Sequence, residues 1–331
     1  MDVIAIIISK TILFAIPLIL GALAGMFSER SGVINIALEG IMVFGSLFAS
    51  IFLIGSFGQT TFAQNNPQMF VLIALGIAGV SGLIFSLSLA YAAINLKANQ
   101  IISGTALNMF APAFAFLFAK AALNINTGSI PLPKDVLKLS SESFGIDSSQ
   151  IAGWVDILFF KNLYLSTILA FVILIIAFVL LYKTRFGLRL RACGEHPQAA
   201  DSVGIKVLRM RYIGVAISGF LAGIAGFSFS IANGAAHEVD VLGYGFLALA
   251  VMIFGNWKPF KILFAALFFS FFKSLAVLAD TLPQFPDFGL NESQYLYKIL
   301  PYAITLAALA FTSKNSRAPK AEGIPYDTGK R

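Results

Sequence analysis

The chain has 331 residues, of which 58% are hydrophobic and only 12% are charged, and its formal net charge is +7. Soluble domains carry about 25% charged residues, so this composition, with a mean hydropathy of +0.85, excludes an ordinary soluble protein. The positive charge lies between hydrophobic runs, where it indicates membrane topology rather than binding to nucleic acid.

Apolar runs of about 20 residues, the length that crosses a bilayer as a helix, recur along the chain. We expect an all-α integral membrane protein, a polytopic helical bundle of about 8–10 transmembrane segments with one or two broken or re-entrant helices. The predicted spans lie near 3–27, 33–55, 69–94, 101–119, 162–182, 212–232, 242–256, 260–280 and 294–313.

The charges between these runs predict which loops are cytoplasmic. The segment 183–211 carries seven basic residues against two acids, and the tail 314–331 carries five against two. The positive-inside rule places both in the cytoplasm. The segment 120–161 is balanced and 281–293 holds only acids, so both are expected outside. The membrane domain is predicted over 1–313.

Alternation along the chain then assigns the earlier loops. It places 28–32 and 95–100 inside and 56–68 outside. The N-terminus follows outside if every predicted span crosses. The segment 242–256 is short and 33–55 carries a charge, so either is a candidate for the broken helix.

Polar residues stand at the entrance of the second span. Asn35 and Glu39 are spaced i, i+4 and would share one helical face. A carboxylate inside the bilayer costs about 2.5–3.5 kcal/mol on insertion scales, so it should face protein or a water-filled path. Gly32 and Gly40 permit a break that would free backbone groups to bind a solute. We predict that Asn35 and Glu39 line a translocation path; a solvated Glu39 near the interface is the alternative.

A second polar group heads the fourth predicted span. Its amides and hydroxyls could bind a polar, uncharged solute, or could bond between helices, and the sequence favours neither. The group consists of Asn99, Gln100, Ser103, Thr105 and Asn108.

The basic loop contains a candidate docking helix within 194–205. Pro197 suits the first turn of a helix and Gly204 suits the residue just past its end. Glu195 and Asp201 are its acids. A short helix between two long spans suits docking into a groove on a cytoplasmic partner. A structured loop without a partner is the alternative.

Several kinds of site are missing from the sequence. The stretch 323–331 departs from a phosphate-binding loop in spacing, and no Ser or Thr follows its lysine, so we expect no ATP site. The sequence contains neither HExxH nor GxSxG, so we expect no enzyme activity. Two histidines and Cys193 do not form a metal cluster, and no cofactor is expected. A stand-alone carrier coupled to an ion would have only Glu39, Lys273 and Lys298 to use.

These motifs resemble the permease subunits of bacterial ABC importers in the branched-chain amino acid and ribose group. The stretch ERSGVINIALEGIM, residues 29–42, is similar to the nucleoside and simple-sugar uptake permeases of that group. Further similar blocks are QIISGTALN at 100–108, GLRLRACGEHPQAADSVGI at 187–205 and GYGFLALA at 243–250. The resemblance extends from about residue 12 to 312, and neither 124–160 nor the tail takes part in it.

The resemblance implies a multi-pass protein of the bacterial cell membrane that works with other subunits. These are two cytoplasmic ATP-binding cassette subunits, a second permease that is commonly a different chain, and an extracellular or periplasmic solute-binding protein. ATP hydrolysis would rock the permease pair between outward-open and inward-open states. By position, 194–205 would be the coupling helix. Its contact residues would be Glu195, Pro197, Ala199, Ala200, Asp201 and Gly204.

The resemblance also suggests which residues line the path. They would be Asn35, Glu39, Asn99, Asn108, Gly243 and Phe246. A neutral, hydrogen-bonding solute with an apolar ring face fits these residue types, so we expect uptake of nucleosides or related simple sugars. The competing hypothesis is a stand-alone, ion-coupled secondary transporter of a small polar solute. Membrane lipid is the remaining expected partner, and nucleic acid is not one.

Overall fold

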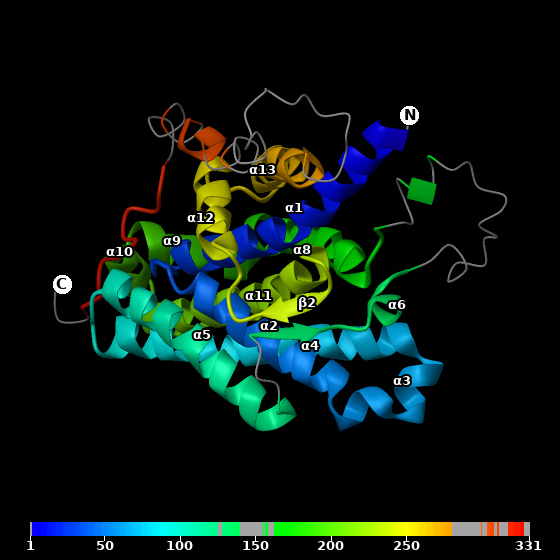
Figure 1. Ribbon diagram of the computed structural model, residues 1–331. Helices are drawn as coiled ribbons and strands as arrows, with labels where there is room; N and C mark the ends of the chain where they lie inside the picture. The colour runs from blue at the N-terminus through cyan, green and yellow to red at the C-terminus, as the bar shows by residue number, and fades with distance from the viewer. Residues whose placement is uncertain are drawn as a thin grey trace.

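The computed structural model of the chain describes residues 2–124, 128–139, 154, 156–157, 162–279, 299, 303–307, 310 and 317–327. These residues form a helical bundle with one small sheet (Figure 1). Among them, six helices are long and apolar enough to cross a membrane, which confirms the predicted all-α membrane fold. They are α1 (Asp2–Glu29), α4 (Pro67–Ala90), α5 (Gln100–Leu123), α8 (Leu165–Lys183), α11 (Val207–Ala232) and α13 (Pro259–Ala279).

Two further apolar helices are shorter. Helix α2 (Leu38–Ile54) has 17 residues and α12 (Tyr244–Phe254) has 11. At 1.5 Å per residue these helices extend about 25 Å and about 16 Å, less than the ~30 Å hydrocarbon core. They occupy the two predicted spans, 33–55 and 242–256, that were candidates for a break. The ninth predicted span, 294–313, lies mostly outside the described residues.

Small elements join the long helices. A helical turn η1 (Ser56–Gln59), α3 (Thr61–Asn65) and α6 (Lys134–Leu137) lie around the outer loops, and the π-helical turn η2 (Tyr91–Asn95) extends α4. Strand β1 (Ser129–Pro131) pairs antiparallel with β2 (Ala236–Glu238). The basic loop folds into α9 (Arg185–Glu195) and α10 (Pro197–Ser202).

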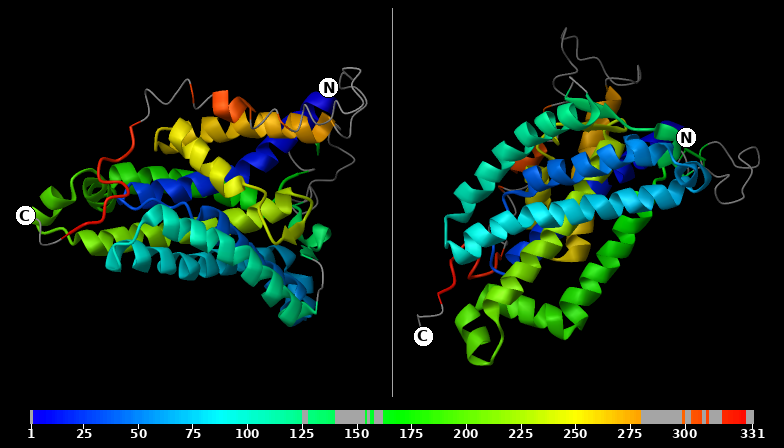
Figure 2. Two further views of the ribbon diagram at one scale, coloured as in Figure 1. Left: turned by 60° about the vertical axis from the view of Figure 1, so that its left-hand side comes forward. Right: turned by 90° about the horizontal axis from the view of Figure 1, so that it is seen from below.

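The loops that were assigned to the cytoplasm meet at one end of the bundle, here called the inner end. Arg30 Nη1 lies 3.5 Å from Glu195 Oε1, and Lys97 Nζ lies 3.1 Å from Asp327 Oδ1. The Ala321 N–H donates to the Gly194 carbonyl at 2.9 Å. Figure 2 shows α9, α10 and the C-terminal tail together at this end, with the N-terminus at the other. These contacts agree with the alternation that the charges predict.

The loop 56–68 and the described part of 120–161, both assigned to the outside, meet at the opposite, outer end, whereas 281–293 lies outside the described residues. The Gln68 side chain donates to the Lys138 carbonyl at 2.9 Å, joining 56–68 to the segment that follows α5. The Asn162 side chain donates to Ser9 Oγ at 2.9 Å, which places the beginning of α1 at the outer end too.

Helices α1 and α11 form the centre of the bundle. Helices α12 and α13 pack on one side of α1, while α2 and α4 pack on α11 and α5 covers α2 (Figure 1). Glycines allow the closest crossings: a β-carbon at Gly21 would come within 2.9 Å of Ala248, and one at Gly45 would clash with the Gly223 backbone. Close approach of this kind is how helices associate in lipid. It brings the two short helices into the middle of the bundle.

Candidate functional site

The segment between α1 and α2, residues 30–37, is not helical, because turns at 30–32 and 36–37 flank residues 33–35, and several of its backbone groups therefore need partners from other elements. Helix α5 supplies them. Asn108 Nδ2 donates to the Ile36 carbonyl at 2.8 Å, and its Oδ1 accepts from the Gly40 N–H at 2.7 Å. Gln100 Oε1 accepts from the Ile34 N–H at 2.8 Å. One asparagine thus satisfies the backbone on both sides of the helix start, and the break is stable because α5 lies beside it.

Asn35 lies in this non-helical segment and is fully buried. Its Nδ2 donates to Ser218 Oγ on α11 at 2.8 Å. Its Oδ1 is buried without a hydrogen-bond partner among the described residues. Since buried polar atoms are nearly always paired, this acceptor is a natural contact for a solute or water in the middle of the bundle.

Glu39, on the first turn of α2, holds the beginning of α12. Its Oε1 accepts from the Gly243 N–H at 2.8 Å and its Oε2 accepts from the Gly245 N–H at 2.7 Å. Gly243 has φ +78, a conformation that favours glycine, and it sets the direction in which α12 starts. A β-carbon at Gly245 would come within 2.5 Å of the Glu39 N. The carboxylate therefore neutralises the positive end of α12 from close range.

The two short helices run in opposite directions from this meeting point. Helix α2 ends at Ile54 beside the outer loops, whereas α12 ends at Phe254 next to Trp257 at the inner end. Each predicted span is therefore helical over only part of its length, here called a half-helix, and the two helix starts face each other. Half-helices of this kind form solute sites in transporters because their freed backbone groups lie at mid-membrane.

The predicted path residues divide into two sets. Asn35, Glu39, Asn108 and Gly243 lie at or beside the meeting point of the half-helices, as the contacts above show. Phe246 follows on the first turn of α12 with 51% of its surface exposed.

Asn99 lies apart from the half-helix ends, because it caps the beginning of α5. Its Oδ1 accepts from the N–H groups of Ile101 and Ile102 at 2.9 and 3.3 Å. This is the ordinary role of asparagine before a first helical turn. Ser218, which bonds Asn35, was missed because a serine in an apolar helix gives no sequence signal of its own.

The predicted docking helix forms as expected in position. Pro197 begins α10, and Gly204 follows it with φ +84. Ala199 and Gly204 are exposed and Asp201 is half-buried, but Ala200 is buried at 3% exposure and points into the hairpin. Ala200 therefore supports the fold of the hairpin, and its neighbour Ala199 belongs to the exposed surface of α10.

The exposed side of this hairpin is basic and partly apolar. Val203 is 75% exposed and Leu188 is 62% exposed. A groove of about 370 Å³ lies beside them, lined by Arg189, Val203, Gly204, Ile205, Lys206, Arg209, Met210 and Ile213. Exposed apolar side chains with basic neighbours suit contact with an acidic or mixed protein surface.

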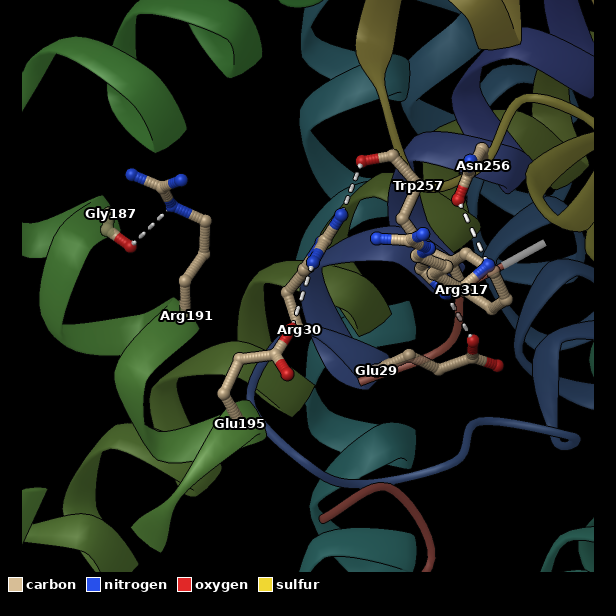
Figure 3. Close-up of polar contacts among 8 residues, drawn as sticks. All are labelled: Glu29, Arg30, Gly187, Arg191, Glu195, Asn256, Trp257 and Arg317. Atoms are coloured by element: carbon tan, nitrogen blue, oxygen red, sulfur yellow. Dashed lines mark hydrogen bonds and ion pairs between the residues drawn. The ribbon is translucent and has the colours of Figure 1, made fainter. Parts of the chain in front are cut away.

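Polar contacts join the hairpin to the end of α12 (Figure 3). Glu29 is buried and accepts from Trp257 Nε1 at 2.6 Å, while Arg30 contacts Glu195 and donates to the Trp257 carbonyl at 3.4 Å. Glu29 and Arg30 therefore both bond to Trp257, just past the end of α12, and Arg30 also contacts Glu195 of the hairpin. The reason is that the end of α12 covers the last turn of α1.

Comparison with known proteins agrees with this architecture. The family described as "Branched-chain amino acid transport system / permease component" matches residues 7–309. The chain is 41% identical to the guanosine ABC transporter permease protein NupQ of Bacillus subtilis, over 100% of this chain and 99% of the relative. It is 36% identical to the nucleoside ABC transporter permease protein NupC of Lactococcus lactis, over 97% and 96%. A second Lactococcus lactis protein, nucleoside ABC transporter permease protein NupB, is 26% identical over 77% and 68%. No solved structure matches the chain.

Proposed function

Since the chain belongs to the family of branched-chain amino acid transport system permease components, we propose that it is the membrane-spanning subunit of an ABC importer for nucleosides or related simple sugars. It is a multi-pass membrane protein. ATP hydrolysis takes place on separate cytoplasmic ATPase subunits, and this chain contributes the path.

The choice of solute rests on the observation that Glu39, a residue of the chain itself, neutralises the start of α12. Helix starts at mid-membrane attract anionic groups, but the start of α12 is already bonded to Glu39, which accepts from the N–H groups of Gly243 and Gly245. The remaining groups are amides and hydroxyls, such as those of Asn35 and Ser218. Such a site favours a neutral solute that hydrogen-bonds. The similarity to a guanosine permease and a nucleoside permease supports the nucleoside class.

Three partners follow from this function. The ATPase docks on the α9–α10 hairpin, which displays Ala199 and Val203. A solute-binding protein delivers the nucleoside at the outer end. The second permease is a different chain, because one organism carries two proteins named as nucleoside permeases that resemble this chain unequally. The face of α5 that displays Met109 and Leu117 is exposed and apolar, so it suits contact with that permease or with lipid.

The proposed division of the chain follows the same scheme. Residues 1–313 form the permease domain, 183–211 is its cytoplasmic coupling loop, 120–161 faces outward and 314–331 is a cytoplasmic tail.

An ion-coupled mechanism fits the structure less well than an ATP-driven one. Glu39 is held by backbone N–H groups, Lys273 Nζ lies 5.9 Å from the Tyr244 ring centre, and Lys298 lies outside the described residues.

Transport by the reconstituted complex tests this proposal. The chain would be assembled in proteoliposomes with its ATPase, second permease and binding protein, and offered labelled guanosine, a pentose, glucose and a branched-chain amino acid. We expect ATP-dependent uptake of guanosine, with the sugars weaker and the amino acid excluded. Uptake of the amino acid alone, or uptake by the lone chain under an ion gradient, would contradict the proposal.

A further inference from the structure

The C-terminal tail, residues 317–327, packs against the inner end although it is polar in sequence. Ala321 and Tyr326 are each only 7% exposed. In Figures 1 and 2 this segment, drawn in red, passes along α9 and the loops at the inner end. A terminal segment of this composition has no intrinsic reason to be ordered, so its position depends on specific contacts.

One set of contacts joins the tail to the docking hairpin. The Ala321 N–H donates to the Gly194 carbonyl, the residue before Glu195 at the end of α9. Gly194 in turn lies so close to the Arg30 carbonyl that a β-carbon would clash with it. The tail therefore touches the hairpin where the hairpin meets the end of α1.

A buried arginine on α11 forms the second attachment. Arg211 is 1% exposed, and its Nη1 donates to the Ile324 carbonyl at 2.9 Å. The Tyr326 ring centre lies 6.0 Å from the Arg211 guanidinium carbon. Arg211 Nε and Nη2 lack hydrogen-bond partners in the described part of the chain. Displacing the tail would therefore remove the Ile324 carbonyl that bonds this buried charge, which is strongly unfavourable unless water replaces it.

The third attachment reaches the non-helical segment 30–37 that precedes α2. A β-carbon at Gly32 would lie 2.8 Å from Arg211 Nη2, and one at Gly323 would lie 2.8 Å from Ile34 Cδ1. Ile34 is directly followed by Asn35, whose side chain lies in the middle of the bundle. The tail thus touches the docking hairpin on one side and the inner mouth of the path on the other.

A fourth contact extends this to α12. The Arg317 N–H donates to Asn256 Oδ1 at 3.2 Å, just past the end of that half-helix (Figure 3). The inner ends of both half-helix spans are therefore connected to one strap, residues 317–327.

We propose that residues 317–327 transmit movement of the docking hairpin α9–α10 to the inner ends of the two half-helix spans, and so couple ATP hydrolysis to opening of the path. This inference rests on the proposed function. The strap residues position the inner ends of the two half-helix spans and do not touch the solute. Without the strap the hairpin still binds the ATPase, but its movement reaches segment 30–37 only through the ends of α1 and α11.

The test measures ATP hydrolysed per nucleoside imported by the complete reconstituted complex. Two variants remove the strap or loosen it: deletion of 317–331, and Tyr326→Ala. Their matched controls are deletion of 328–331, which leaves the strap, and Tyr326→Phe, which keeps the ring beside Arg211. We expect the ratio to rise several-fold in the first two and to stay near the wild-type value in the controls. In the same two variants, the stimulation of ATP hydrolysis by the loaded binding protein should decrease.

An unchanged ratio in both strap variants would overturn the proposal, even if hydrolysis and uptake decreased together, because a merely structural role lowers both equally. If the variant that lacks 317–331 does not reach the membrane, the ratio measured for Tyr326→Ala alone tests the proposal. Failure of the proposed function is distinguishable, since the wild-type complex itself would then show no ATP-driven nucleoside uptake.

Discussion

The substitution Glu39→Gln examines the meeting point of the two half-helices. The carboxylate accepts one N–H group with each oxygen, at 2.8 Å from Gly243 and 2.7 Å from Gly245. A glutamine has one acceptor oxygen, so its amide nitrogen would face the second N–H group as donor against donor. The variant therefore loses one hydrogen bond and the charge, while the shape of the side chain is kept.

The magnitude follows from these two losses. A hydrogen bond to a charged group contributes about 1.5–3 kcal/mol, and a carboxylate at a helix start contributes about 0.3–1 kcal/mol. The sum is about 2–4 kcal/mol against the correct placement of α12. Since about 1.4 kcal/mol corresponds to a factor of ten, we expect nucleoside uptake to fall at least tenfold.

The assay is initial-rate uptake of labelled guanosine by proteoliposomes, with the amount of each variant in the membrane measured on the same samples. Glu238→Gln is the matched control, because Glu238 accepts from Ser129 Oγ at 2.9 Å in the outer sheet, away from the half-helix ends. It should transport normally. Wild-type uptake by Glu39→Gln at equal membrane level would refute the role given to Glu39.

Three further predictions concern α5, the hairpin and the tail. Asn108→Ala removes both hydrogen bonds across the helix break and should lower uptake tenfold or more, measured against Asn99→Ala, which removes only a cap of α5. Ala199→Glu, on the exposed side of α10, should weaken co-purification of the ATPase while the chain still inserts; normal recovery of the ATPase would exclude this docking surface. Burial raises the pKa of Glu322 to about 7, against the opposing effects of its hydrogen bond to Glu29 and the charge of Arg30. Docking of the tail should therefore be tightest below the free pKa of a glutamate, about 4.3, and weaken as the pH rises to about 7. Labelling of Ala321→Cys by a maleimide should increase over that range, and the increase should exceed the one seen when Glu322→Gln is also present.

The sequence was sufficient to predict the membrane bundle and the grouping of its loops, because both depend on average properties. Runs of apolar residues locate helices wherever backbone groups must be satisfied internally, and the excess of basic residues in 183–211 and 314–331 marks one end. The contact of Lys97 with Asp327 and of Arg30 with Glu195 shows these loops together.

The half-helices were only partly predictable. Glu39 and Asn35 were conspicuous because polar residues are expensive in an apolar run, and Gly243 was suggested by family resemblance. The partner of Glu39 lies about 200 residues further along the chain, and no local pattern specifies that pairing. Asn99 and Asn108 could not be distinguished in the sequence. Asn99 caps the first turn of α5, whereas Asn108 bonds the backbone before and after the start of α2, and this difference depends on where α5 begins.

The inner end was the least predictable region, because its contacts join segments that each resemble solvated surface. Ala200 is buried because α10 packs its apolar side against α9. The periodicity of a six-residue helix is too short to predict which side that is. Arg211 was counted as a topological charge, yet it is covered by the tail. A polar segment such as 317–327 shows no sign of burial until its partners are known.

The central claim is that the solute path runs beside the meeting point of α2 and α12, and photolabelling of the assembled complex tests it most directly. A photoreactive guanosine analogue would be crosslinked during turnover, and the labelled peptides identified by mass spectrometry with and without excess guanosine. We predict labelling, abolished by guanosine, in peptides that contain residues 35–39, 108 or 243–246. Guanosine-sensitive labelling confined to other helices would contradict the account.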